Sequence, residues 1–175
     1  PFEYCDIVTT TVHKTLRGPR SAIIFSRNDK SMIDAKGKKQ SYSELIDKAV
    51  FPGLQGGPHN NQIAAVAVAL KEADSVTFKK YAKQVKRNAK TLADELMKRG
   101  WHVISGGTDS HLVLVDVWMG GIKNEKGAGG LTGQDASDRL EKVGIIVNKN
   151  TIPGEPRTAF DPSGIRLGSA AETTR

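Results

Sequence analysis

The chain has 175 residues, of which 38% are hydrophobic, so it has room for one globular domain or a domain and a half. Its formal charge of +7 favours an anionic ligand or partner, and nucleic acid is one such partner. The single cysteine, Cys5, excludes an intrachain disulfide and fits a reducing compartment. The histidines lack the spacing of a metal site, and no apolar run is long enough to cross a membrane.

Two predicted strands at the start of the chain flank a lysine. Residues 7–12 are mostly β-branched, which is typical of a buried strand, and a second apolar strand is predicted over 22–25. Lys14 lies between the two strands, shortly before a Gly-Pro turn. We expect apolar walls at the strand end to desolvate this amine and to favour its neutral, nucleophilic form. A solvated loop lysine is the alternative.

The next part of the chain is polar and then strongly apolar. Residues 28–49 are polar and rich in lysine, and a short helix is predicted over 43–48. A Gly/Pro loop follows over 53–58. Residues 62–73 are apolar on nearly every side of a helix, so we expect this helix to be buried.

A long amphipathic helix is predicted over 78–96. Apolar residues recur there at steps of three and four, and Gly100 is a natural C-terminal stop. Its opposite face carries the basic residues Lys79, Lys80, Lys83, Lys86, Arg87 and Lys90. This face could bind nucleic acid, but we favour a solvated surface because no aromatic residues are interleaved with the charges.

The last part of the chain alternates strands and helices. The predicted elements are a strand over 111–118, a Gly-rich loop over 120–130, a helix from 132 to 143, a strand over 145–148, and a Pro/Gly loop that leads to 164–168. Thr132 and Asp135 have the spacing of a capping box at the start of that helix. Alternation of this kind predicts an α/β or α+β layered domain.

Four segments of the chain follow one another as recognisable motifs. They are TTTVHKTLRGPR, VFPGLQGGPHNNQIAAVAVALKEA, VNKNTIPGEPRTAFDPSGIRLG and the closing TTR. In this order they resemble the serine hydroxymethyltransferase family, and the resemblance covers nearly the whole chain. It implies the α/β fold of type I pyridoxal-phosphate-dependent transferases.

The resemblance also implies that the chain is an internal fragment, because family members are more than twice as long. Residues 1–75 would then be the end of the large, cofactor-binding domain. Residues 76–100 would form the connecting helix, and residues 101–175 a truncated C-terminal small domain.

The implied activity is the interconversion of serine and glycine, with pyridoxal 5'-phosphate as cofactor and transfer of the one-carbon unit to tetrahydrofolate. The resemblance further implies a homodimer with shared active sites, or a tetramer, in the cytoplasm or alternatively in the mitochondrion. We expect the fragment itself to be inactive, because the family places further active-site residues before Pro1. The other hypotheses are a threonine aldolase-type enzyme of the same fold and a non-enzymatic basic module that binds nucleic acid.

The first motif carries the residues that the resemblance assigns to chemistry. Lys14 would bind the cofactor covalently. His13 would tune substrate and reaction specificity, with a buried, hydrogen-bonded histidine as the alternative. Thr11 would donate or accept a hydrogen bond near the cofactor.

Three further residues would hold the cofactor by resemblance. Arg20 would bind active-site anions, although a surface ion pair is the alternative. Gly56 and Gly57 precede a helix and would reach the cofactor phosphate of the neighbouring subunit. Glycine lets backbone N–H groups approach an anion, and a helix N-terminus adds partial positive charge, but an ordinary turn has the same composition.

The third motif would bind the substrates. Arg166 matches the arginine that binds the substrate carboxylate, a role that suits the planar guanidinium. Asn150 matches a folate-contacting position, and Thr158, Ala159 and Phe160 lie on a loop that also contacts folate in the family. Turn and cap roles are the alternative for these four residues.

Two departures from the family pattern leave local geometry open. Val12 stands where relatives usually carry a fourth threonine, which removes a hydroxyl next to the lysine. Ser169-Ala170-Ala171-Glu172 stands where the family commonly has Thr-Pro.

Overall fold

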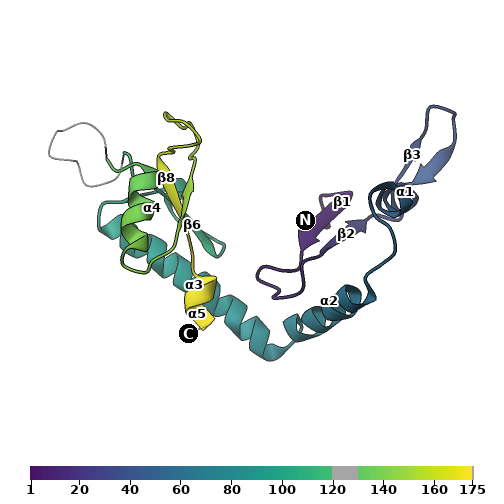
Figure 1. Ribbon diagram of the computed structural model, residues 1–175, viewed down its shortest axis with the longest axis horizontal. Coiled ribbons are helices and arrows are strands. Elements are labelled where there is room, and N and C mark those ends of the chain that lie inside the picture. Colours follow the sequence, from purple (N-terminus) through teal and green to yellow (C-terminus); the bar gives the residue numbers. More distant parts are fainter. Residues whose placement is uncertain (120–129, 175) are drawn as a thin grey trace. The chain divides into compact units, whose positions relative to one another are not determined.

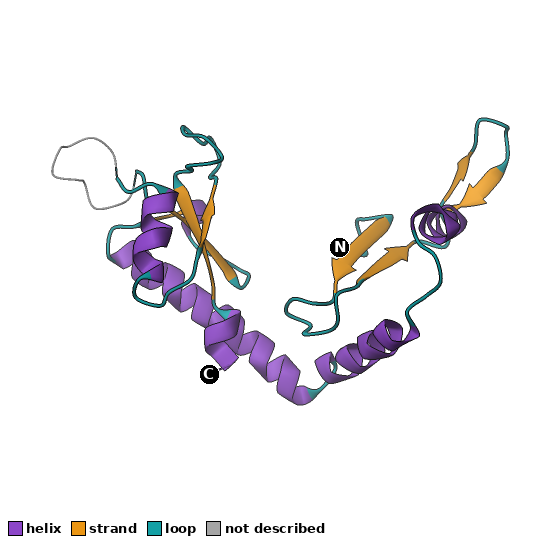
Figure 2. Ribbon diagram, viewed as in Figure 1, coloured by secondary structure: helices purple, strands orange, loops and turns teal. Residues whose placement is uncertain are grey.

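The computed structural model describes residues 1–119 and 130–174. The chain forms two compact units, Pro1–Ser75 and Val76–Arg175, and both combine helices with strands (Figures 1 and 2). The fold is therefore mixed α/β. Within the described residues, no helix combines the length and the apolar character that a membrane span requires.

The first unit begins with an antiparallel hairpin. Strands β1 (Ile7–Thr11) and β2 (Ala22–Ser26) pair from Ile7 opposite Ser26 to Thr11 opposite Ala22. This confirms the two strands predicted on either side of the lysine. The predicted burial of the first strand is wrong, because β1 has a single partner strand and only Val8 is half-buried among its residues.

A second hairpin, which was not predicted, lies within the polar stretch 28–49. Strands β3 (Ser31–Ile33) and β4 (Lys39–Ser41) pair around a turn in which the Asp34 carboxylate accepts hydrogen bonds from two backbone N–H groups. Gly37 in this turn has a φ of +78°, which glycine adopts without strain. The hairpin leads directly into helix α1 (Tyr42–Lys48), as predicted, and Ser41 and Glu44 form a capping box at its start.

Helix α2 (Asn60–Ala73) follows an irregular helical turn, η1 (Ala49–Leu54). The helix was predicted correctly, but the prediction that it is buried is wrong. Only Ala69 is buried, whereas Ile63 and Val68 are 58% and 59% exposed. The lysine loop lies against α2 at Ala69, and this contact covers a single side of an apolar helix.

The second unit is built on a four-stranded antiparallel sheet in the order β5–β6–β8–β7. Its strands are β5 (His102–Val103), β6 (Leu112–Asp116), β7 (Asn148–Asn150) and β8 (Gly164–Gly168). Its helices are α3 (Val76–Lys98), the short turn η2 (Ile104–Gly106), α4 (Gly133–Glu141) and α5 (Ala170–Thr174).

The core of this unit lies between α3, α4 and one face of the sheet. Its buried members are Ala89, Ala93, Val103, Val113, Val115, Val117, Ala136 and Ile165. The apolar stripe predicted for α3 supplies the helix side of this core, and Gly100, with a φ of +85°, ends the helix region as predicted. The hydroxyl of Thr132 accepts a hydrogen bond from the N–H of Asp135 (3.0 Å), which confirms the N-terminal cap of α4.

One predicted strand is displaced along the chain. The strand expected over 145–148 begins only at Asn148, and Ile146 is 83% exposed. The N–H of Ile145 still donates to the carbonyl of Leu140, and Gly144 has a φ of +83°, so these residues end α4 instead of starting a strand. The predicted Gly-rich loop over 120–130 lies outside the described residues, except for Gly130.

Candidate active site

The lysine loop, residues 12–21, is closed at its base by two backbone hydrogen bonds. The N–H of Val12 donates to the carbonyl of Ser21 (3.0 Å), and the N–H of Gly18 donates to the carbonyl of Val12 (2.7 Å). A Cβ atom at Gly18 would lie 2.9 Å from the Val12 oxygen and 3.1 Å from the Cβ of Ala69. Only glycine fits this approach without displacing its neighbours, so the loop lies directly against α2.

Lys14 itself is held in a tight turn. The N–H of Arg17 donates to the carbonyl of Lys14 (2.9 Å), and Arg17 has a φ of +59°, which is uncommon for a residue with a side chain. The side chains of Thr11, His13 and Lys14 are all exposed within this unit. The apolar walls that we expected around Lys14 are therefore not supplied by residues 1–75.

Val12, and not Lys14, takes the buried position of the loop. It is fully buried and packs with Ala69 across Gly18. A threonine hydroxyl at this position would need a hydrogen-bond partner to offset its desolvation, whereas the valine methyl group does not. This explains how the loop accommodates the departure from the family pattern.

A cavity of about 760 Å³ lies beside this loop within the first unit. Arg20 and Gly57 both line it, so the structure brings together two of the residues predicted to bind the cofactor. Gly56 and the residues of β1 and of the Lys14 turn are not among its lining residues within the described part of the chain.

The cavity has the features of a phosphate site. The guanidinium of Arg20 is cationic. His59 is the N-cap residue of α2, and its side chain makes no capping hydrogen bond to the first N–H groups of the helix. The first N–H groups of a helix have no partner within it, so they and the positive end of the helix dipole favour an anion. Asp47 also lines the cavity, and Gln62 Oε1 is a buried acceptor without a hydrogen-bond partner among the described residues, so neither of these groups favours an anion. Arg20, Gly57 and the start of α2 are the parts of the cavity that fit a phosphate such as that of pyridoxal phosphate.

Arg166 lies on the face of the second unit's sheet that is opposite the helices. Its neighbour Ile165 is buried in the core, and side chains alternate along a strand, so the exposed Arg166 points away from the core. Within the described residues, no hydrogen bond or ion pair holds its guanidinium.

Asn150 lies on the same face as Arg166, on the adjacent strand. Asn148 is opposite Arg166 and Asn150 is opposite Gly164, so residues 148 and 150 share the side of the sheet that carries Arg166. The structure therefore brings together the predicted carboxylate-binding and folate-binding residues of β7 and β8.

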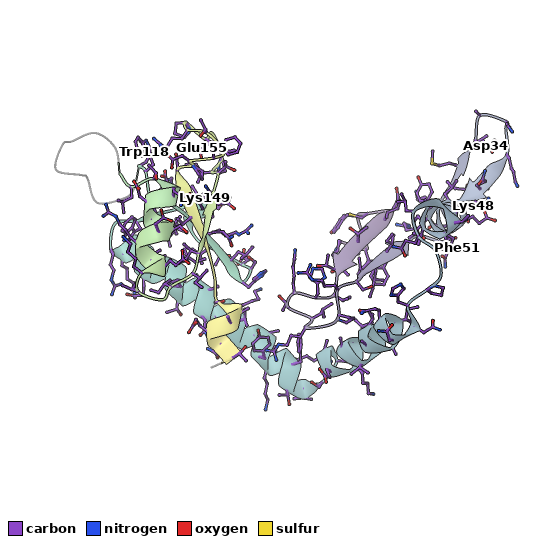
Figure 3. All side chains as sticks on the ribbon, in the orientation of Figure 1. Asp34, Lys48, Phe51, Trp118, Lys149 and Glu155 are labelled. Atoms are coloured by element: carbon purple, nitrogen blue, oxygen red, sulfur yellow. The ribbon has the colours of Figure 1, made fainter. Side chains whose placement is uncertain are left out.

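The loop between β7 and β8 carries the other predicted folate residues. Thr158, Ala159 and Phe160 are all exposed, and the Phe160 side chain is 88% exposed. Figure 3 shows Trp118, Lys149 and Glu155 gathered around this end of the unit.

Glu155 is the residue of this loop that sequence reasoning missed. Its carboxylate accepts hydrogen bonds from the backbone N–H groups of Ile152, Arg157 and Ser163 and from the Ser163 hydroxyl. Burial raises the pKa of this carboxyl, but the hydrogen bonds from Ser163, Arg157 and Ile152 outweigh burial and lower its pKa to about 2. A glutamate in a Pro/Gly loop gives no sequence signal for such a role, because its partners are backbone groups.

The second departure from the family pattern is also accommodated. Ser169 is 7% exposed, its hydroxyl donates to the carbonyl of Val85 (2.8 Å), and its N–H donates to the carbonyl of His111 (3.1 Å). Ser169, three residues after Arg166, therefore connects the end of β8 to α3.

The basic face of α3 is exposed and partly neutralised within the helix. Lys90 of this face pairs with Asp94 (3.7 Å), and Lys98, near the end of the helix and outside this face, pairs with Glu95 (2.7 Å). Hydrogen bonds from Lys98 and Arg99 lower the pKa of Glu95 to about 2. Among the described residues, no cluster of His, Cys, Asp and Glu could hold a metal ion.

Comparison with known proteins shows similarity over the entire chain. The family model of serine hydroxymethyltransferase matches residues 1–175. The serine hydroxymethyltransferases of Bombyx mori and Desulfotalea psychrophila are 51% and 48% identical to this chain, and the mitochondrial serine hydroxymethyltransferase of Candida glabrata is 49% identical. Each match covers 100% of this chain but only 36%, 36% and 35% of the respective relative. The chain thus spans little more than a third of the length of these curated relatives.

Proposed function

Because the chain belongs to the serine hydroxymethyltransferase family, we propose that it is part of an enzyme that interconverts serine and glycine and passes the one-carbon unit to tetrahydrofolate. The proposal concerns the whole protein, since the chain spans 36% of its relatives.

The observation that carries this proposal is the placement of Arg166. Its exposed guanidinium lies on an open sheet face beside Asn150, without a partner among the described residues. A planar guanidinium binds a carboxylate through two parallel hydrogen bonds, and both serine and glycine present such a carboxylate. The exposed loop residues Thr158, Ala159 and Phe160 would contact tetrahydrofolate near the same strands.

The cofactor would be pyridoxal 5'-phosphate. When bound, it supplies an electron sink for negative charge that develops at the substrate α-carbon. Lys14 would hold it through its Nζ atom, Arg20 would bind active-site anions, and Gly56 and Gly57 would reach the phosphate of the cofactor in the neighbouring subunit. His13 would tune substrate and reaction specificity, and the Thr11 hydroxyl would hydrogen-bond near the cofactor.

We assign the chain to the type I fold of pyridoxal-phosphate-dependent transferases. Residues 1–75 would complete the large domain, 76–100 would be the connecting helix, and 101–175 would be part of the small domain. The whole protein would be a homodimer or tetramer with shared active sites, in the cytoplasm or, as for the Candida glabrata relative, in the mitochondrion.

The test uses the full-length protein loaded with pyridoxal phosphate. It should convert serine to glycine only when tetrahydrofolate accepts the one-carbon unit. Borohydride reduction followed by peptide mapping should then find the cofactor on Lys14. A matched control is Lys36→Arg in the exposed turn between β3 and β4, which should leave both results unchanged.

Three outcomes would contradict the proposal. Cofactor attached to another lysine would remove the role of Lys14. Cleavage of threonine that never depends on folate would favour a threonine aldolase-type enzyme. Absence of any conversion of serine would reject the activity itself.

A further inference from the structure

We propose that Glu155 is a positioning residue that fixes the loop between β7 and β8, so that the ring of Phe160 is held ready for the flat ring system of tetrahydrofolate. This inference rests on the proposed function. It adds a residue that does not contact the ligand but controls the affinity for one of the two substrates.

The Glu155 carboxylate joins the two ends of the loop. Its Oε2 atom accepts from the N–H of Ile152 (3.2 Å) near the start and from the N–H of Ser163 (3.1 Å) at the end. Its Oε1 atom accepts from the N–H of Arg157 (2.9 Å) and from the hydroxyl of Ser163 (2.6 Å). Ser163 is fully buried, so the far end of this connection is fixed in the unit's interior.

Arg157, held by Glu155 at its backbone, extends the connection to the tip of the loop. Its guanidinium lies over the ring of Trp118, with 4.3 Å between Cζ and the ring centroid. It also donates to the carbonyl of Asp161 (3.0 Å) and forms an ion pair with the Asp161 carboxylate. Asp161, the residue that follows Phe160, is therefore fixed through Arg157.

Phe160 is fixed at its backbone while its side chain is free. The Nζ atom of Lys149 donates to the Phe160 carbonyl (2.7 Å) and to Gln134 Oε1 (2.6 Å), which connects the loop tip to α4. The Phe160 side chain nevertheless is 88% exposed. An aromatic ring on a fixed backbone offers a flat apolar surface whose binding costs little ordering of the protein.

The other substrate site does not depend on Glu155. Arg166 lies on β8, which is paired along its length with β6 and along 148–150 with β7. Loss of the Glu155 hydrogen bonds should therefore loosen the loop without moving the strand position of Arg166. The effect should fall on tetrahydrofolate and spare serine.

The test is Glu155→Gln in the full-length, cofactor-loaded protein. Glutamine keeps the shape of the side chain, but its NH₂ group replaces one acceptor oxygen and faces two of the four donors that now bond to the carboxylate. We expect the KM for tetrahydrofolate to rise about tenfold, and the KM for serine and the cofactor absorbance to change less than twofold. Calorimetric binding of tetrahydrofolate in the presence of glycine should weaken by the same factor.

Two further variants keep the test decisive. Glu141→Gln removes a carboxylate from the exposed C-terminal end of α4 and should change none of these values. Ser163→Ala removes one of the four donors and should raise the KM for tetrahydrofolate about threefold, which gives a second measurement if Glu155→Gln does not fold.

The outcomes separate this inference from the proposed function. If the unsubstituted protein transfers no one-carbon unit to tetrahydrofolate, the proposed function fails. If it does, but both variants leave tetrahydrofolate binding unchanged, the positioning role of Glu155 is rejected. Equal losses for serine and tetrahydrofolate would also reject it, because they would show a general role in folding.

Discussion

The two units of this chain differ in how much of their apolar surface they bury by themselves. In the described residues, Val12 and Ala69 are the buried hydrophobic residues of Pro1–Ser75, whereas the second unit buries a continuous core between its sheet and two helices. A two-stranded hairpin has little stability alone, but a sheet of three or more strands with one covered face can fold independently. The second unit therefore has a hydrophobic core of its own, whereas the first buries very little apolar surface.

The helices of the two units show why. Helix α3 carries an apolar stripe on one side and lysines on the other, so contact with a single sheet face is enough to bury its apolar side. Helix α2 is apolar on several sides, and Ile63 and Val68 stay exposed although they suit a protein interior. An apolar pattern that covers the whole helix is thus a sign of partners that residues 1–75 do not provide.

The largest expected effect is a difference in folding between the two units when each is made as a separate chain. Residues 76–175 alone should show a cooperative thermal transition and dispersed amide NMR signals, because their core is internal. Residues 1–75 alone should show neither, since the hairpin β1–β2 and α2 lack cover. A cooperative transition of the first piece, or none in the second, would overturn the comparison.

The next effect compares the chemistry assigned to each unit in the full-length enzyme. Lys14→Arg should abolish conversion of serine, because a guanidinium with a pKa above about 12 stays protonated and cannot attach the cofactor. Arg166→Ala should keep the cofactor absorbance but weaken serine binding by about 2–5 kcal/mol, through loss of a paired cation. An activity assay measures the loss of conversion in Lys14→Arg, and spectroscopic titration with serine measures the weaker binding in Arg166→Ala.

A result in which Arg166→Ala changes serine affinity by less than about 1 kcal/mol would reject its role in binding the carboxylate. Loss of the cofactor from Arg166→Ala would show that substrate binding by Arg166 and cofactor binding in the first unit are not independent.

A smaller effect compares matched apolar truncations in the 175-residue chain. Val115 is 2% exposed in the core of the second unit, so Val115→Ala should destabilise that unit by about 2 kcal/mol. Ile24 is 44% exposed on β2, so Ile24→Ala should change the same transition by less than about 0.5 kcal/mol. Urea denaturation followed by circular dichroism measures both, and equal losses would show that the units unfold together.

The sequence predicted those elements whose signal is local. The stripe of α3, the Thr132 cap and the strands around Lys14 follow from spacing within a few residues. The hairpin β3–β4 was missed because its strands are only three residues long and polar, and the strand at 145–148 was misplaced because the end of α4 extends into it.

The candidate site was predicted through motifs, and its supporting contacts were not. Arg166 and Asn150 were assigned by resemblance, and the register of β7 and β8 shows that they share a face. Glu155 accepts hydrogen bonds from backbone groups up to eight residues away, so no pattern of residue types predicts its role. The burial of Val12 depends on Gly18 and Ala69, and the second of these lies on a helix far along the chain.

The smallest effect compares the N-terminal caps of two helices, a single Thr132 side-chain acceptor at α4 and a capping box of Ser41 and Glu44 at α1. Thr132→Ala removes the side-chain acceptor for the N–H of Asp135 at the start of α4, which covers the core of the second unit through the buried Ala136. Ser41→Ala removes the matched acceptor for the N–H of Glu44 at the start of α1, a helix without buried residues.

An uncapped N–H costs about 1 kcal/mol of helix stability in either place. That cost reaches the urea midpoint of the chain only where the helix is part of a cooperative core. Thr132→Ala should therefore lower the midpoint by the equivalent of about 1 kcal/mol, and Ser41→Ala should leave it unchanged within error. Equal shifts from the two variants would mean that α1 and α4 belong to one folding unit, and the difference between the two regions would then lie in exposure alone and not in stability.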